Sequence, residues 1–140
     1  MEAWRTHTDR PPVGETEIAE AESRLGLVLP DPIRDFYMLV GDGGDGVFPL
    51  LKPDPELEPF QTLVGMYLAW RQPEPDDPKW SWPEGVAPIF HWGCVVYTCV
   101  DLCDPDARVR GYDDGSWVPD GRTFAEWLST PSTQPRAGSA

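Results

Sequence analysis

The stretch TEIAEAESRLGLVLPDPIRDFYMLVG, residues 16–41, contains two consecutive helix signals and says more about the fold than any other part of the chain. Thr16 is a favourable N-cap, and acidic residues follow it in the first turn, where the helix dipole favours them. Apolar residues then recur on one helical face: Ile18, Ala21 and Leu25. Gly26 supplies the left-handed residue with which such a helix ends. We therefore predict an amphipathic helix from Thr16 to Gly26.

A second helix is predicted directly after the connecting turn. Asp31 is expected to be its N-cap, with Pro32 at the first helical position and Gly41 at its end. Its apolar positions are Ile33, Phe36, Tyr37 and Val40. The glycine-rich residues 41–46 cannot form regular structure and predict a loop, and the apolar run Val47–Leu51 predicts a strand.

After a loop that prolines break at residues 52–59, apolar residues return at helical spacing and predict a third helix that ends near Arg71. These residues are Phe60, Leu63, Val64, Tyr67 and Leu68. Residues 72–84 combine four prolines with two tryptophans and predict a long surface loop. Loops of this kind often carry function.

The last third of the chain predicts strands and a short helix. Residues 87–102 are rich in β-branched and aromatic residues and divide at Gly93 into two strands. Ala107–Tyr112 is predicted as a return strand, followed by a turn at residues 113–115. Thr123 then caps a helix whose inward side chains are Phe124, Trp127 and Leu128.

The length of 140 residues fits one domain with a single core. Apolar residues make up 40% and charged residues 25%, close to the averages of globular proteins, so the 17 prolines are expected mainly in loops. We predict an N-terminal tether over residues 1–14, a folded domain over 15–129, and a disordered tail over 130–140.

Several of these segments resemble the SUKH superfamily, named after yeast cell-wall synthesis regulators and abundant among bacterial toxin-immunity proteins. The residues that carry the resemblance are Ile18-x3-Glu22-x2-Leu25-Gly26-x2-Leu29-Pro30, Phe36-Tyr37, the loop Gly41–Gly46, and Ser116–Leu128 with its Thr123-Phe124-x2-Trp127-Leu128 ending. The resemblance implies an α+β domain with a mixed, mainly antiparallel sheet and about four helices packed against it. It also implies a protein-binding role without catalytic residues. We interpret Glu22 and Leu29-Pro30 as structural, a polar anchor and a helix-connecting turn.

The charge of the chain restricts its partners. Aspartate and glutamate number 24 against 11 lysines and arginines, which gives a net charge of −13. Such a surface repels nucleic acids and anionic membranes and attracts basic proteins. An acidic surface that serves only solubility is the alternative interpretation.

Cysteine usage indicates a reducing compartment, and we predict a cytoplasmic location. The closely spaced Cys94, Cys99 and Cys103 do not form a disulfide framework. Together with His91 they suggest a zinc site, but residues an odd number apart on a strand face opposite sides, so we predict no metal and no cofactor. A cysteine-dependent enzyme could pair Cys94 with His91 as its base, but the sequence supplies neither an orienting third group nor an oxyanion motif.

The glycine loop also lacks the chemistry of a phosphate or calcium site. It has no lysine or serine of a phosphate-binding loop, and Asp42 and Asp45 would repel phosphate. The spacing of these two aspartates fits no EF-hand. We predict an ordinary turn here and keep both aspartates as second-choice residues for binding a protein.

Tryptophans beside carboxylates are the preferred candidates for a binding site. Tryptophan dominates interface hot spots, and charge steers encounter with a basic partner. The candidates are Asp76, Asp77, Trp80, Trp82, Asp113, Asp114 and Trp117. In the competing interpretation these rings fold back over the sheet edges.

The leading functional hypothesis is an immunity protein that neutralises a basic toxin domain by covering it. An adaptor that binds an endogenous protein is the second hypothesis, and a small cysteine- or metal-dependent enzyme is the third.

Overall fold

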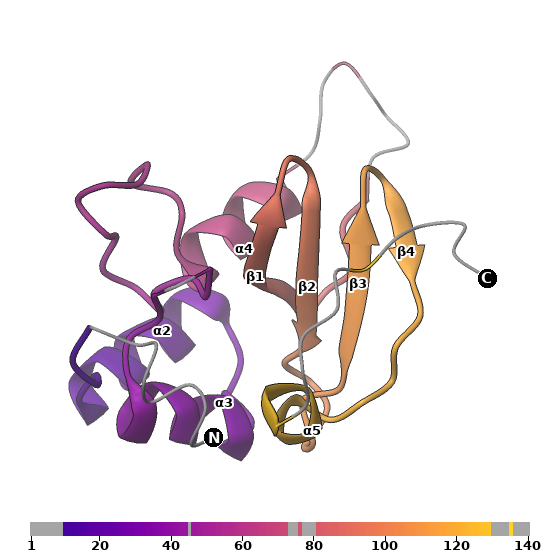
Figure 1. The fold of residues 1–140 in the computed structure, drawn as a ribbon. Helices are drawn as coiled ribbons and strands as arrows, with labels where there is room; N and C mark the ends of the chain where they lie inside the picture. The colour runs from indigo at the N-terminus through magenta and orange to yellow at the C-terminus, as the bar shows by residue number, and fades with distance from the viewer. Residues whose placement is uncertain (1–9, 45, 73–75, 77–80, 130–134, 136–140) are drawn as a thin grey trace.

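The structure is a computed structural model and describes residues 10–44, 46–72, 76, 81–129 and 135 (Figure 1). In this part of the chain, helices and an antiparallel four-stranded sheet pack together around one core, which confirms the predicted α+β class.

Helix α2 spans Glu15–Leu25 and buries the three predicted residues, Ile18, Ala21 and Leu25. The predicted cap at Thr16 is wrong, because the N-cap is Gly14, whose carbonyl accepts the first helical hydrogen bond from the N–H of Ile18 at 3.2 Å. The buried Val13 fixes this start, since its N–H donates to the carbonyl of Tyr37 at 2.9 Å. Gly26 ends the helix with φ 76°, as predicted.

The second predicted helix consists of two segments. Helix α3 spans Asp31–Asp35 with Pro30, not Asp31, as N-cap, and it continues as the π-helix η1 over Phe36–Val40. Gly41 ends η1, with its N–H donating to the carbonyl of Phe36 at 3.2 Å, five residues back. The wider turn keeps Phe36, Tyr37 and Val40 buried, although the sequence predicts only a regular helix.

Glu22 is the polar anchor that the sequence indicates. Its Oε2 accepts hydrogen bonds from the backbone N–H of Leu29 at 2.7 Å and from Nη2 of Arg34 at 3.3 Å. One carboxylate therefore joins α2, the connecting turn and α3.

The predicted strand Val47–Leu51 is wrong. Only residues 46–48 lie along the sheet. The N–H of Phe48 donates to the carbonyl of Ile89 at 2.9 Å, and the N–H of His91 donates to the carbonyl of Gly46 at 2.8 Å. The pairing stops there because Pro49 has no N–H and the N–H of Leu50 donates to Oδ1 of Asp42 at 2.8 Å.

Helix α4 spans Leu63–Arg71, three residues shorter at its start than predicted. Thr62 is its N-cap, since its hydroxyl oxygen accepts a hydrogen bond from the N–H of Gly65 at 2.8 Å. Phe60, expected on the buried face of the helix, therefore lies before it and is exposed.

The sheet has the order β1-β2-β3-β4, with every neighbouring pair antiparallel. The strands are β1 Val86–Gly93, β2 Val96–Asp101, β3 Val109–Asp113 and β4 Ser116–Val118. The first three confirm the predicted strands and the division at Gly93. Strand β4 is not predicted by the sequence, which indicates only a turn at residues 113–115 before it.

Helix α5 spans Phe124–Ser129 and buries Phe124, Trp127 and Leu128 as predicted. Figure 1 shows α2, α3 and α4 beside the β1 edge of the sheet, with α5 near the lower ends of β2 and β3. Phe36 and Phe124 meet edge-on with ring centroids 5.6 Å apart, which joins α5 to η1.

Parts of the two predicted terminal segments are described. Residues 10–14 lie against the domain, where the N–H of Asp42 donates to the carbonyl of Arg10 at 3.3 Å. Pro135 occupies the space that a side chain at Gly111 of β3 would need.

Candidate functional site

Four aromatic residues lie in register across the whole sheet, one on each strand. The pairs are His91 with Tyr97, Tyr97 with Tyr112, and Tyr112 with Trp117. Directly opposed residues in a sheet share a face, so these side chains form one continuous row, here called the aromatic row. The row depends on β4, which places Trp117 in the sheet and not in a loop.

Two tryptophans from outside the sheet cover this row. Trp70 of α4 lies 4.9 Å from Tyr97, and Trp82 lies 5.2 Å from Tyr112 and 5.0 Å from Trp117, measured between ring centroids. Trp82 is only 3% exposed, and its indole N–H donates to the carbonyl of Val86. The prediction of Trp82 as an anchor for a partner therefore needs correction: this ring belongs to the core.

The other predicted residues near the row remain at the surface. Trp117 is 37% exposed, and the guanidinium of Arg110 lies 4.7 Å from the centroid of its ring. Asp113 ends β3 and the exposed Asp114 follows it in the turn, so the structure brings these three predicted residues together. The exposed Asp76 belongs to the loop after α4. Asp45, Asp77 and Trp80 lie outside the described residues.

Asp42 is a structural residue, which corrects its candidacy as a binding residue. It is 5% exposed, and its Oδ1 accepts the N–H of Leu50 while Oδ2 accepts Nη2 of Arg10 at 3.2 Å. Burial raises the pKa of Asp42, although both hydrogen bonds and the positive charge of Arg10 act in the opposite direction. Its carboxylate holds the glycine loop against the start of the domain.

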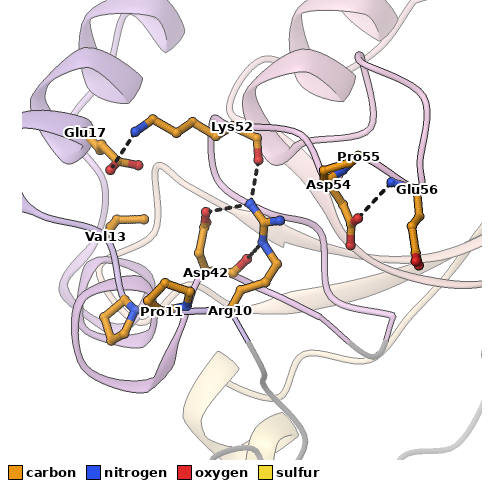
Figure 2. Close-up of a pocket in the computed structure, with 10 residues that line it drawn as sticks. Arg10, Pro11, Val13, Glu17, Asp42, Lys52, Asp54, Pro55 and Glu56 are labelled. Carbon is orange, nitrogen blue, oxygen red and sulfur yellow. Dashed lines mark hydrogen bonds and ion pairs between the residues drawn. The ribbon is translucent and has the colours of Figure 1, made fainter.

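A cavity of about 530 Å³ lies beside this carboxylate and is here called the Arg10 cavity. Figure 2 shows residues that line it. The guanidinium of Arg10 also donates to the carbonyl of Asp42 at 3.0 Å and to that of Lys52 at 2.9 Å. Nζ of Lys52 lies 3.4 Å from Oε1 of Glu17. Both cations of this cavity thus interact with groups of the chain itself.

The segment over residues 53–61, here called the acidic loop, forms one wall of the same cavity. Its carboxylates are Asp54, Glu56 and Glu58. In the described part of the chain no lysine or arginine lies within ion-pair distance of them. Oδ1 of Asp54 accepts the N–H of Glu56 at 2.9 Å, which shapes the loop. Leu57 lies between the charges and Phe60 just after them, and these two apolar side chains are 45% and 51% exposed.

A second cavity, of about 240 Å³, is also lined by Asp54 and Glu56 of the acidic loop. It separates the acidic loop from the glycine loop and is here called the glycine-loop cavity. Its lining includes Gly44 and Gly46, the partly exposed His91, and the acidic residues Asp54 and Glu56. The second-choice binding region of the sequence analysis therefore borders the acidic loop.

The cysteines do not converge on a site. Cys99 is buried, whereas Cys94 and Cys103 are exposed, and Nε2 of His91 contacts the carbonyl of Cys94 at 3.4 Å and not its thiol. Across the described residues, no three histidine, cysteine or carboxylate side chains are grouped so that they could hold a metal ion. No helix in the described part is long and apolar enough to span a membrane.

Comparison with known families gives one result. The model of the SMI1/KNR4 family (SUKH-1) matches residues 12–130. The chain belongs to the SMI1/KNR4 family. This confirms the resemblance, and SUKH-1 membership places the chain in a family that includes immunity proteins and is generally non-catalytic. A search of curated proteins finds no match.

In this SUKH-1 domain the acidic loop is a candidate site that the sequence did not predict, because residues 52–59 indicate only a connection broken by prolines. The signal that could have found it is the alternation of Asp54, Glu56 and Glu58, with Leu57 between them and Phe60 just after. Exposed apolar patches with a polar rim are typical of interaction sites.

Proposed function

We propose that the chain is a cytosolic immunity protein, a non-catalytic domain that binds a basic toxin domain and covers its working surface. The observation that supports this best is the acidic loop. It presents carboxylates that no described cation neutralises, together with exposed Leu57 and Phe60, on a chain of the SUKH-1 family. The free thiols fit a reducing compartment.

The overall charge supports a basic partner. A net charge of −13 raises the encounter rate with a positively charged protein and keeps nucleic acid away. The acidic loop adds the apolar contact that charge alone does not supply, because buried apolar anchors contribute most of the affinity at interfaces. The turn with Asp113, Asp114 and Trp117 is the alternative binding face.

The test uses the toxin domain encoded beside the gene for this chain. We expect the purified chain to abolish the toxin's activity in stoichiometric amounts. If no toxin domain is encoded there, or its activity is unaffected, the immunity proposal is wrong. Binding of an endogenous protein would then support the adaptor hypothesis.

Variants that remove charges distinguish the acidic loop from the turn with Asp113 and Asp114 as the binding face. Replacing Asp54→Asn, Glu56→Gln and Glu58→Gln together should slow association with the toxin domain roughly tenfold at low salt and reduce its salt dependence. The matched control removes three exposed charges elsewhere, by Glu20→Gln, Asp35→Asn and Glu84→Gln. If the Asp113→Asn/Asp114→Asn variant shows the effect and the acidic-loop variant does not, the turn is the binding face.

A further inference from the structure

We propose that the glycine-loop cavity receives an arginine side chain of the partner protein. This inference rests on the proposed function and names the chemistry of one contact within it. Three properties of the cavity support it: the charge of its lining, its size and the rigidity of its backbone.

The lining of the cavity favours a cation. Asp54 and Glu56 contribute carboxylates, and the described lining contains no lysine or arginine. The neighbouring Arg10 cavity shares these two acidic residues but also contains Arg10 and Lys52. A cation from outside therefore meets two carboxylates and no lysine or arginine in the described lining of the glycine-loop cavity.

The size fits one side chain. A volume of about 240 Å³ lies below the roughly 300–1,000 Å³ that small-molecule sites occupy, so a cofactor is a poor fit. A single extended side chain from a partner surface needs less room. The exposed Leu57 also lines this cavity, which places an apolar contact next to the charged one.

The two carboxylates favour arginine over lysine. Asp54 and Glu56 both line the cavity. The N–H groups of a planar guanidinium can bind a carboxylate in two places, which an ammonium group cannot do.

The wall is already in place without a partner. Hydrogen bonds to β1 fix the backbone at Gly46 and Phe48, and the carbonyl of Phe48 also accepts the hydroxyl of Tyr37 at 2.7 Å. Gly46 has φ +98° and lies so close to the ring of Phe90 that a side chain there would collide with it. Such preorganisation lowers the entropy lost on binding.

The experiment titrates the full chain with the peptide acetyl-Gly-Arg-Gly-amide and follows backbone amide signals by NMR. We expect saturable shifts at Gly44, Gly46 and His91. The same peptide with citrulline, which keeps the shape and loses the charge, should bind roughly fivefold more weakly or not at all.

Matched variants test the role of the carboxylates. Asp54→Asn/Glu56→Gln should weaken binding of the arginine peptide at least about threefold, because both ion pairs are lost. The asparagine side chain introduced by Asp54→Asn retains a carbonyl oxygen that can accept the N–H of residue 56, so the loop keeps its shape. Glu20→Gln/Asp35→Asn, with the same change in net charge, should leave binding unchanged. The amide spectrum of each variant reports whether the fold is intact.

Three results would overturn the inference: no saturable shift at these amides, equal binding of the citrulline peptide, or equal binding by the Asp54/Glu56 variant. The toxin assay and the peptide titration test separate claims, because the titration contains no toxin. A chain that inhibits the toxin but shows no peptide binding disproves the arginine contact and leaves the proposed function standing. The reverse result disproves the function and leaves the cavity as an arginine site.

Discussion

Glu22 shows how much a single side chain can hold together. Replacing Glu22→Ala should lower the free energy of unfolding by about 1–3 kcal/mol, because the N–H of the buried Leu29 loses its acceptor and Arg34 loses its ion pair. Glu22→Gln retains an acceptor and should lose less. Urea unfolding of both variants measures the difference, and equal losses would show that the hydrogen bond to Leu29 contributes little.

The three thiols should differ in reactivity. Cys99 is buried, and burial raises the pKa of its thiol far above the ordinary value, so it should react with a thiol reagent only after unfolding. Cys94 and Cys103 should react in the native protein. Burial, followed by the nearby Asp101 and Glu84, raises the pKa of Cys103, so its labelling should be slow at neutral pH and accelerate as the pH rises.

Labelling with an Ellman-type reagent at several pH values, with Cys94→Ser and Cys103→Ser variants as controls, assigns each phase. Three equally fast thiols in the native protein would contradict the burial of Cys99.

Asp42 should make stability depend on pH. Burial raises the pKa of Asp42, so the folded state holds this proton more tightly than the unfolded chain. The residue therefore contributes stability below its ordinary pKa of about 4, and this contribution is lost as the pH rises through the higher folded pKa. In Asp42→Asn the side chain keeps an acceptor for the N–H of Leu50 and no longer titrates.

The difference in free energy of unfolding between the wild type and Asp42→Asn should accordingly fall as the pH rises from about 4 towards neutrality. Urea unfolding of both proteins across this range gives the difference directly. A difference that grows with pH would mean that the ion pair with Arg10 outweighs burial.

Among the elements, α5 depends on one cap and one buried face. The hydroxyl oxygen of Thr123 accepts the N–H of Glu126 at 3.1 Å, and Oε1 of Glu126 accepts the N–H of Thr123 at 3.0 Å, a reciprocal capping box. Thr123→Ala should cost about 1 kcal/mol. Trp127→Ala should cost about 3–5 kcal/mol, because Trp127 is fully buried.

Thermal and urea unfolding of the two α5 variants provide the values, with the exposed Ala125 as a control position for substitution by serine. A cap variant as damaging as the tryptophan variant would show that α5 is held mainly by its first turn.

The sequence predicts helices well where local signals and burial agree. Gly26 and Gly41 end their helices as predicted, and the Thr123 signal leads to α5. The predicted strand after the glycine loop fails because Asp42, eight residues away, takes the N–H of Leu50. Strand β4 has three residues and no pattern of its own, so its pairing with β3 depends on tertiary structure.

The candidate site was less predictable, because it too depends on tertiary structure. Trp82 follows a proline-rich segment, which suggests exposure, yet it packs against Trp70 and the aromatic row. Conversely, Phe60 fits the apolar pattern of the third predicted helix, which suggests burial, but the late start of α4 leaves it at the surface. Whether a loop side chain is buried depends on what the rest of the chain places over it.

At the scale of the whole molecule, charge repulsion should oppose folding. Ion pairs among the described residues involve few of the 24 acidic side chains, and the net charge of −13 repels itself in the compact state. Raising sodium chloride from about 10 mM to about 300 mM shortens the screening length several-fold and should raise the melting temperature.

Calorimetry at several salt concentrations tests this, with the triple control variant Glu20→Gln/Asp35→Asn/Glu84→Gln expected to respond less steeply. A melting temperature that falls with salt would show that the ion pairs outweigh the repulsion.

The sheet margins have an evolutionary consequence. Residues 46–48 occupy the free side of β1, and Gly121 and Arg122 exchange hydrogen bonds with Val109 where β3 extends past β4. Described strands thus offer little backbone for a foreign strand to join, since β4 is short and Pro119 follows it. Recognition then rests on side chains at loops, which can mutate without disturbing the core. A lineage carrying this scaffold could change its partner protein through a few surface substitutions. Relatives are therefore expected to diverge fastest at the acidic loop.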